Sequence, residues 1–228
     1  MKRLCSRSIT PLLLALCAGF LFACSNTPKA PDWQLESKGA MDRSIAAYLE
    51  GNVRIEQAEL TRARDQLSST GRADLMAGAE LLHCAAHVAS LVFEPCVGFE
   101  PLKPDSTEAQ RAYADYLGGQ LVPTKIVLLP TSQQAAASRG AEDGKPLQGI
   151  ADPLSLLVAA GVLLETGKAS PATIAQAVDT ASHQGWRRPL LAWLGVQAQR
   201  ATLAGQTAEA ERLQRRIKLV QNEATPVK

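Results

Sequence analysis

Signals for the start and stop of helices recur along this chain more regularly than any other feature, and they constrain its fold the most. Proline in a first helical turn and glycine just after a last turn mark the two ends of α-helices. Here Asp152-Pro153 and Ser170-Pro171 are typical starts, and Gly185 and Gly205 are typical ends. The pattern predicts helices near residues 42–50, 53–69, 73–93, 106–117, 153–167, 171–185, 189–205 and 207–220.

The composition agrees with closely packed helices. Hydrophobic residues make up 46% of the 228 residues and aromatic residues only 4%, so Ala, Leu, Val and Ile must form the core. Such a core suits helices better than a β-sandwich. The formal charge of +2 is far from the basic excess of a nucleic-acid-binding protein, so no nucleic-acid partner is expected.

Two stretches break the helical pattern. Residues 121–129 are rich in β-branched side chains and contain Pro123. A lone strand would leave its backbone groups unpaired. We therefore expect a short buried helix that Pro130 kinks and that continues to Arg139. Residues 139–149 are rich in glycine and charge, which predicts an exposed loop.

A short pattern recurs at several predicted helix ends. Each copy combines a leucine, a glycine free to adopt a positive φ, and a polar residue before the next helix. Gly51 and Gly119 lie 68 residues apart, twice the period of about 34 residues in tetratricopeptide repeats. The copies are residues 48–52, 116–120, 164–168 and 202–206.

The pattern resembles the helical hairpins of tetratricopeptide-like repeats, most closely over residues 191–220. The resemblance implies an all-α fold of antiparallel helical hairpins, stacked as a short α-solenoid or bundle. It also implies a surface for binding or scaffolding proteins, as in repeat folds generally.

The first 23 residues have the layout of a signal peptide. Lys2, Arg3 and Arg7 precede an apolar run at residues 11–23, which is too short to span a membrane. The run ends in Leu21-Phe22-Ala23-Cys24, which resembles the lipobox of bacterial lipoproteins. In that family, signal peptidase II cuts before the cysteine, and the cysteine sulfur carries a lipid.

This resemblance divides the chain into three parts. It implies a lipoprotein signal peptide at residues 1–23, a lipidated Cys24 with a flexible tether at residues 24–37, and a single helical domain at residues 38–228. Ser25 after the cysteine implies a lipid anchor in the outer membrane, on its periplasmic face. The alternative is an ordinary secreted protein whose signal happens to end in cysteine.

Loss of the signal peptide changes the charge. Residues 1–23 hold three of the 24 Lys and Arg and none of the 22 Asp and Glu, so the rest of the chain has a net charge near −1. From Ala181 onward, basic residues outnumber acidic ones by five. Such an excess is typical of a solvated helix face; the alternative is contact with an anionic envelope surface or an acidic partner.

Cys84 and Cys96 are the cysteines that remain once the signal peptide is removed and Cys24 is lipidated. An even pair in an oxidising compartment predicts a disulfide bond. It would hold the loop at residues 97–105 against the helix that carries Cys84. The alternative is two free cysteines that act as small buried apolar residues.

The sequence lacks the zinc-protease pair of histidines, the P-loop and the nucleophile elbow. Glu80, His83, His87 and Glu94 are spaced to share one helix face, where two imidazoles at i,i+4 could bind zinc or copper. No further ligand is evident later in the chain. We therefore expect a polar stripe on the solvent side of the helix, with neither metal nor cofactor.

Trp186, Arg187 and Arg188 form a candidate partner contact, because Trp and Arg are common at interface hot spots. The alternative is a tryptophan that fills the gap between adjacent hairpins. Together these features predict a non-catalytic adaptor or assembly factor for another envelope protein. The alternative is a periplasmic cell-wall-active enzyme with Glu80 or Glu94 as its carboxylates, and a third is a structural lipoprotein without a specific ligand.

Overall fold

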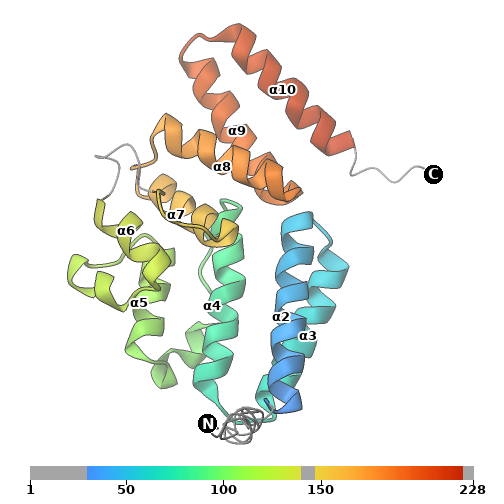
Figure 1. Cartoon of the computed structure of the whole chain (residues 1–228), viewed down its shortest axis with the longest axis vertical. Helices are drawn as coiled ribbons and strands as arrows, with labels where there is room; N and C mark the ends of the chain where they lie inside the picture. Colours follow the sequence, from blue (N-terminus) through green and yellow to red (C-terminus); the bar gives the residue numbers. More distant parts are fainter. Residues whose placement is uncertain (1–29, 140–146, 223–228) are drawn as a thin grey trace, which may run out of the picture. The chain divides into compact units, whose positions relative to one another are not determined.

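The computed structural model describes residues 30–139 and 147–222, and every regular element in these ranges is a helix (Figure 1). This confirms the predicted all-α fold. The α-helices and two 3-10 helices, η2 and η3, follow in the order α2 Asp32–Glu50, α3 Val53–Ser68, α4 Ala73–Ala89, η2 Glu100–Asp105, α5 Glu108–Leu117, η3 Pro123–Leu128, α6 Thr131–Arg139, α7 Pro153–Glu165, α8 Pro171–Gln184, α9 Arg187–Leu203 and α10 Thr207–Asn222.

Antiparallel hairpins organise both ends of the described chain (Figure 1). Helices α2 and α3 pack against each other along their lengths, joined by only Gly51 and Asn52. Helices α9 and α10 form a second hairpin, and α8 packs between α7 and α9. Short connections of this kind place consecutive helices side by side, which is the predicted hairpin arrangement.

The repeated glycine pattern marks the same structure each time. In all four copies the glycine adopts a positive φ, between 69° and 91°. At the first copy, the Gly51 amide bonds to the Tyr48 carbonyl and the Asn52 amide bonds to the Ala47 carbonyl. The same pair of bonds recurs at Gly119, Gly167 and Gly205. These are Schellman ends, in which glycine satisfies the last helical carbonyls without steric cost.

Side-chain caps fix the starts of α5, α7 and α8. The Asp152 carboxylate accepts the Ser155 amide at 2.7 Å, and the Ser170 hydroxyl accepts the Thr173 amide at 3.1 Å. Each cap of this kind stabilises a helix by about 1 kcal/mol. Helix α5 begins two residues later than predicted, because Thr107 forms a reciprocal capping box with Gln110.

Helix α4 is shorter than predicted, because it ends at Ala89 and not near Phe93. Leu91 has φ of 61°, the left-handed conformation that glycine adopts at the other ends. The amides of Leu91 and Val92 bond to the carbonyls of Val88 and His87, completing the same Schellman pattern. The loop that follows α4 therefore begins four residues earlier than expected.

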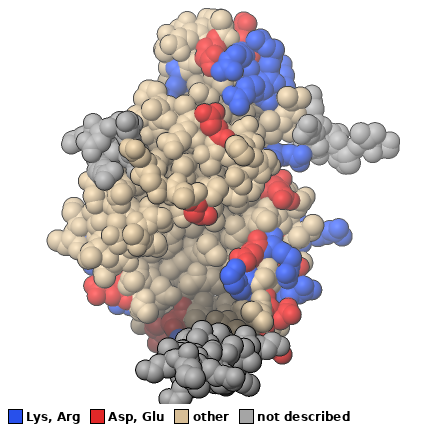
Figure 2. All heavy atoms as spheres, in the orientation of Figure 1, with Lys and Arg blue, Asp and Glu red and all other residues tan. Residues whose placement is uncertain are grey.

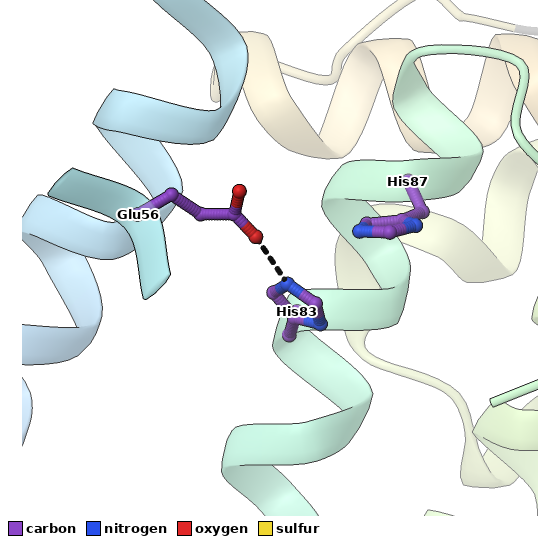
Figure 3. Close-up of side chains that lie close together, drawn as sticks. All are labelled: Glu56, His83 and His87. Atoms are coloured by element: carbon purple, nitrogen blue, oxygen red, sulfur yellow. Dashed lines mark hydrogen bonds and ion pairs between the residues drawn. The ribbon is translucent and has the colours of Figure 1, made fainter. Parts of the chain in front are cut away.

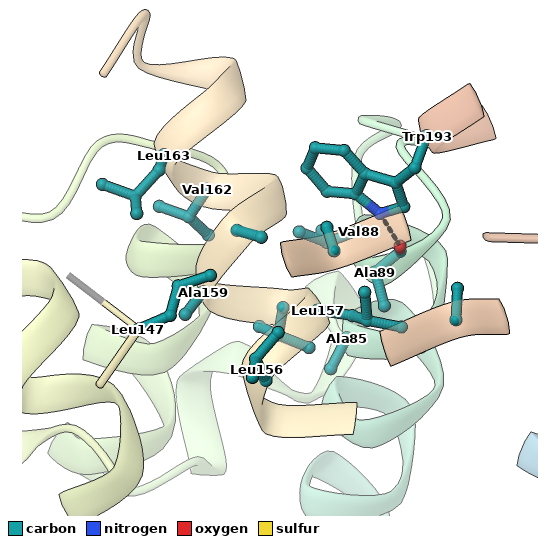
Figure 4. Packing of buried hydrophobic residues seen from close by; sticks show 14 of the residues in the cluster. Ala85, Val88, Ala89, Leu147, Leu156, Leu157, Ala159, Val162, Leu163 and Trp193 are labelled. Atoms are coloured by element: carbon teal, nitrogen blue, oxygen red, sulfur yellow. Dashed lines mark hydrogen bonds between the residues drawn. The ribbon is translucent and has the colours of Figure 1, made fainter. Parts of the chain in front are cut away.

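Two hydrophobic cores meet at α4. The smaller core joins α2 and α3 to α4, and the larger joins α4 to α5, α7, α8 and α9. Trp193 is completely buried in the larger core, and its indole N–H donates to the Ala89 carbonyl at 3.1 Å (Figure 4). The central position predicted for this helix is confirmed, because α4 contacts α2, α3, α5, η2 and α7.

Two expectations about local structure are wrong. Helix α2 begins at Asp32, so residues 32–37 of the predicted tether are helical, and Ser37 is buried. Residues 123–128 form a 3-10 helix without a buried residue rather than a buried α-helix, and α6 follows as a separate element after Pro130. Cys24 and most of the predicted loop at residues 139–149 lie outside the described residues.

Candidate functional site

A groove of about 470 Å³ runs along α4. Its lining includes His83 and His87 from α4, Phe93 and Glu94 from the loop after α4, and Asp115 from the last turns of α5. It thus brings the last turns of α5 beside α4 and the loop that follows α4.

A disulfide between Cys84 and Cys96 shapes the groove. Their Cα atoms lie 5.8 Å apart, and the bond joins α4 to the loop after it, as predicted. Both half-cystines line the groove. For a ring of this size, the chain-entropy model gives a stabilisation of about 3 kcal/mol.

Glu80 does not lie on a solvent-facing stripe, and that prediction is wrong. Its carboxylate is buried and accepts two hydrogen bonds from Arg64 of α3, at 2.6 and 2.7 Å. The hydrogen bond to Glu80 raises the pKa of the Arg64 guanidinium. Such a pair occupies both carboxylate oxygens, so Glu80 is poorly placed to exchange protons with a substrate.

The loop after α4 approaches this ion pair closely. A Cβ atom on Gly98 would lie 2.0 Å from Glu80 Oε2, so only glycine fits there. Glu94, predicted to share a helix face with the two histidines, lies beyond the end of α4 in this loop and is exposed. The four-residue cluster expected from the sequence therefore does not form.

A different acidic residue joins the histidines (Figure 3). Glu56 Oε1 of α3 lies at hydrogen-bond distance from His83 Nε2, 3.0 Å away. One ligand atom from each of Glu56, His83 and His87 lies within 4.8 Å of the other two. The i,i+4 spacing of the two histidines indicates that they share one face of α4. The third group, the Glu56 carboxylate, comes from α3.

Tyr48 and Arg188 complete this cluster on the side of α2 and α9. The Tyr48 ring stacks on His87 with centroids 4.4 Å apart and an interplanar angle of 11°. The Arg188 guanidinium lies 4.3 Å above the Tyr48 ring, and its Nε donates to the Tyr48 carbonyl at 2.8 Å. Cation–π contact of this kind contributes about 1 kcal/mol.

Burial sets the charge state of His87. Burial and, to a smaller extent, the neighbouring His83 lower the pKa of the imidazole to about 4, although Glu56 opposes the shift. His87 is therefore neutral at pH 7. Its Nε2 is buried and has no hydrogen-bond partner among the described residues.

The predicted partner contact is divided between two roles. Trp186 precedes the first turn of α9 and packs against both cores, so it fills a gap between hairpins. Arg188 contacts the ring and the backbone carbonyl of Tyr48 within the molecule. Arg187 is half-buried beside them, and a partner contact through Trp186, Arg187 and Arg188 stays a prediction.

Glu56 could have been found in the sequence. It lies on the buried face of α3 with Leu60, Ala63 and Leu67, at the i, i+4, i+7 and i+11 positions of one stripe. A carboxylate on an apolar stripe needs a partner, because an unpaired buried charge is costly. The identity of that partner depends on how α3 packs on α4, which no local pattern specifies.

Comparisons of the chain with protein-family models, with curated proteins and with solved structures found no match. Among residues 30–139 and 147–222, no helix is both long enough and apolar enough to cross a membrane. The function must therefore be argued from the residues and their geometry.

Proposed function

We propose that this chain is a lipid-anchored protein of the bacterial envelope that binds a second envelope protein as a non-catalytic adaptor. The lipobox-like run that ends at Cys24 supports the anchor. The helical hairpins support the adaptor role, because stacked hairpins present extended surfaces to partners.

The observation that carries the adaptor role is the exposed face of α10, the last helix of the last hairpin. We define the α10 surface as Arg215, Lys218 and Leu219, which share one side of the helix at i, i+3 and i+4. Leu219 is 65% exposed, although it is a large apolar side chain. Figure 2 shows Lys and Arg side chains gathered over the α9–α10 hairpin.

Charge indicates what kind of partner this surface fits. Neither Arg215 nor Lys218 forms an ion pair with a described residue, whereas Arg212 on the same helix is paired with Glu209 at 2.6 Å. A shallow depression of about 380 Å³ lies beside them, lined also by Thr202, Gln214 and one acidic residue, Glu211. Unpaired cations around an exposed leucine fit an acidic segment of a protein that carries an apolar side chain.

Site-specific photo-cross-linking in intact cells tests the adaptor role. A photoreactive residue at Leu219 should give a discrete adduct with one protein, and Arg215→Glu with Lys218→Glu should abolish the adduct. Val127 on η3 is the matched control, because it is an apolar side chain that is 73% exposed on a different element. No adduct from Leu219, or the same adduct from Val127, would contradict the proposal.

The anchor is tested separately by incorporation of labelled palmitate. We expect label in the wild-type protein and none in Cys24→Ala, which should also leave the membrane fraction. An unlabelled wild-type protein would remove the lipid anchor from the proposal. The cross-linking result would still decide whether the α10 surface binds a partner.

A further inference from the structure

A cluster of side chains that could ligate a metal ion joins α3 to α4 and has no part in the proposed adaptor role. Glu56 comes from α3, and His83 and His87 project from one face of α4 (Figure 3). Their ligand atoms lie within 4.8 Å of one another. Glu56 and His83 already approach to 3.0 Å, close to the separation of roughly 3.3 Å between neighbouring ligand atoms in a tetrahedral zinc site.

The chemistry of these three groups selects among metal ions. Two imidazole nitrogens and one carboxylate oxygen suit Zn²⁺ and its borderline neighbours, whereas Ca²⁺ and Mg²⁺ prefer sites made entirely of oxygen. Sites with three protein ligands keep a fourth position for water or another molecule. His83 and His87 both line the groove along α4, so that position has access to the groove.

A second observation points to an absent ligand. His87 Nε2 is buried and has no hydrogen-bond partner among the described residues. Buried polar atoms are almost always satisfied, and an exception calls for a water or an ion. The stacking of Tyr48 on His87 fixes the orientation of the His87 ring. The ring therefore loses less conformational entropy when it binds a metal.

We infer that Glu56, His83 and His87 form a binding site for one Zn²⁺ ion, which would link the α2–α3 hairpin to α4. Zinc binding at this site would require neither the lipid anchor nor a partner protein. It also differs from the cluster considered from sequence, because Glu56 replaces Glu80 and Glu94. The Arg64–Glu80 ion pair and the disulfide hold α3 and the loop after α4 beside the site.

Zinc titration by calorimetry tests the site directly. The purified, tag-free protein is treated with a chelator, dialysed, and titrated with Zn²⁺ alone. We expect one ion per chain with a dissociation constant well below millimolar. Glu56→Gln and His87→Gln should each weaken binding at least about tenfold, because each removes a ligand.

His183→Gln is the matched control. His183 is the chain's third histidine, lies exposed on α8, and should be replaceable without loss of affinity. Absence of binding below millimolar zinc would overturn the inference. So would a loss of affinity in His183→Gln equal to that in His87→Gln, or unchanged affinity in Glu56→Gln.

A measurement on the wild-type protein avoids any folding defect in the variants. Diethyl pyrocarbonate modifies accessible neutral imidazoles, and mass spectrometry can assign the modified histidine. Zinc should slow modification of His83, which lines the groove, and leave that of His183 unchanged. Equal rates of His83 modification with and without zinc would refute the site.

Discussion

Replacement of Gly161 by alanine tests how closely α7 approaches α4, the helix that carries the two histidines. A Cβ atom on Gly161 would lie 2.5 Å from the Val88 carbonyl oxygen and 3.0 Å from Val88 Cγ1. The carbonyl belongs to the α4 backbone and accepts the Leu91 amide at 3.0 Å, so it cannot move alone. The two helices must separate.

The expected cost follows from two opposing effects. Overpacking of a core by one methyl group costs about 1–3 kcal/mol. Alanine is also a better helix former than glycine, by about 1 kcal/mol. Gly161→Ala should therefore lower the free energy of unfolding by about 1 kcal/mol. Without the clash, the same substitution would raise it by about the same amount.

Gly195→Ala is the matched control. Gly195 lies inside α9, is exposed, and a Cβ atom there would have no neighbour within 4 Å. This variant should be more stable than the wild type by about 1 kcal/mol. The two variants should then differ by about 2 kcal/mol, or by about 4–8 °C in Tm for a chain of this size.

Urea denaturation followed by circular dichroism at 222 nm measures the difference, and thermal unfolding provides a second value. If Gly161→Ala is stabilised as much as Gly195→Ala, then α4 and α7 do not meet at this glycine. The position of α4, which lines the groove, relative to α7 of the larger core would then be wrong.

Three further predictions concern α4. Trp193→Phe removes the indole donor to the Ala89 carbonyl and should lower the free energy of unfolding by about 1–3 kcal/mol in the same urea assay; no change would mean that the bond is absent. Replacing Cys84 and Cys96 together by alanine should cost about 3 kcal/mol and make stability insensitive to dithiothreitol, whereas a wild type insensitive to dithiothreitol would argue against the bond. In chelator, the contribution of His87 to the free energy of unfolding should be fully present above about pH 6.5 and should be lost as the pH falls toward about 4. Burial lowers the pKa of His87 to about 4, so the unfolded chain binds the proton first. His87→Gln should reduce that loss, and an unchanged pH profile would exclude His87 as its source.

Helix ends could be predicted from the sequence wherever glycine marks them. Gly119, Gly167 and Gly205 all take the positive φ that their place in the pattern implied. The end of α4 could not be predicted, because Leu91 occupies the position where glycine normally stands. The left-handed backbone of Leu91 is strained, and packing of its side chain against the larger core offsets this strain.

The start of α2 was missed for a different reason. Its first two buried positions are Ser37 and Ala40, so small side chains replace the leucines that usually reveal a buried helical face. Composition therefore favoured a tether over a helix at residues 32–37. Small residues suffice there because α2 lies close along α3, and close approach needs little side-chain volume.

The candidate site shows where local pattern stops being informative. The i,i+4 spacing correctly placed His83 and His87 on one face of α4, because that relation is a property of any helix. The third member, Glu56, belongs to α3, and its approach depends on non-local packing. Glu80 on the same side of α4 meets Arg64 of α3 through the same packing.

The polar stripe of α4 therefore makes contacts within the protein rather than with solvent alone. Glu80 bonds Arg64, His83 meets Glu56, and Cys84 is bridged to the loop that follows α4. Three different chemistries thus fasten a single helix face to α3 and to its own loop. Polar contacts are directional, and a one-residue slip would break all of them together, whereas apolar side chains tolerate repacking. This fixed register is what keeps His83 and His87 opposite Glu56, so the candidate zinc site depends on the same contacts that specify the helix pairing.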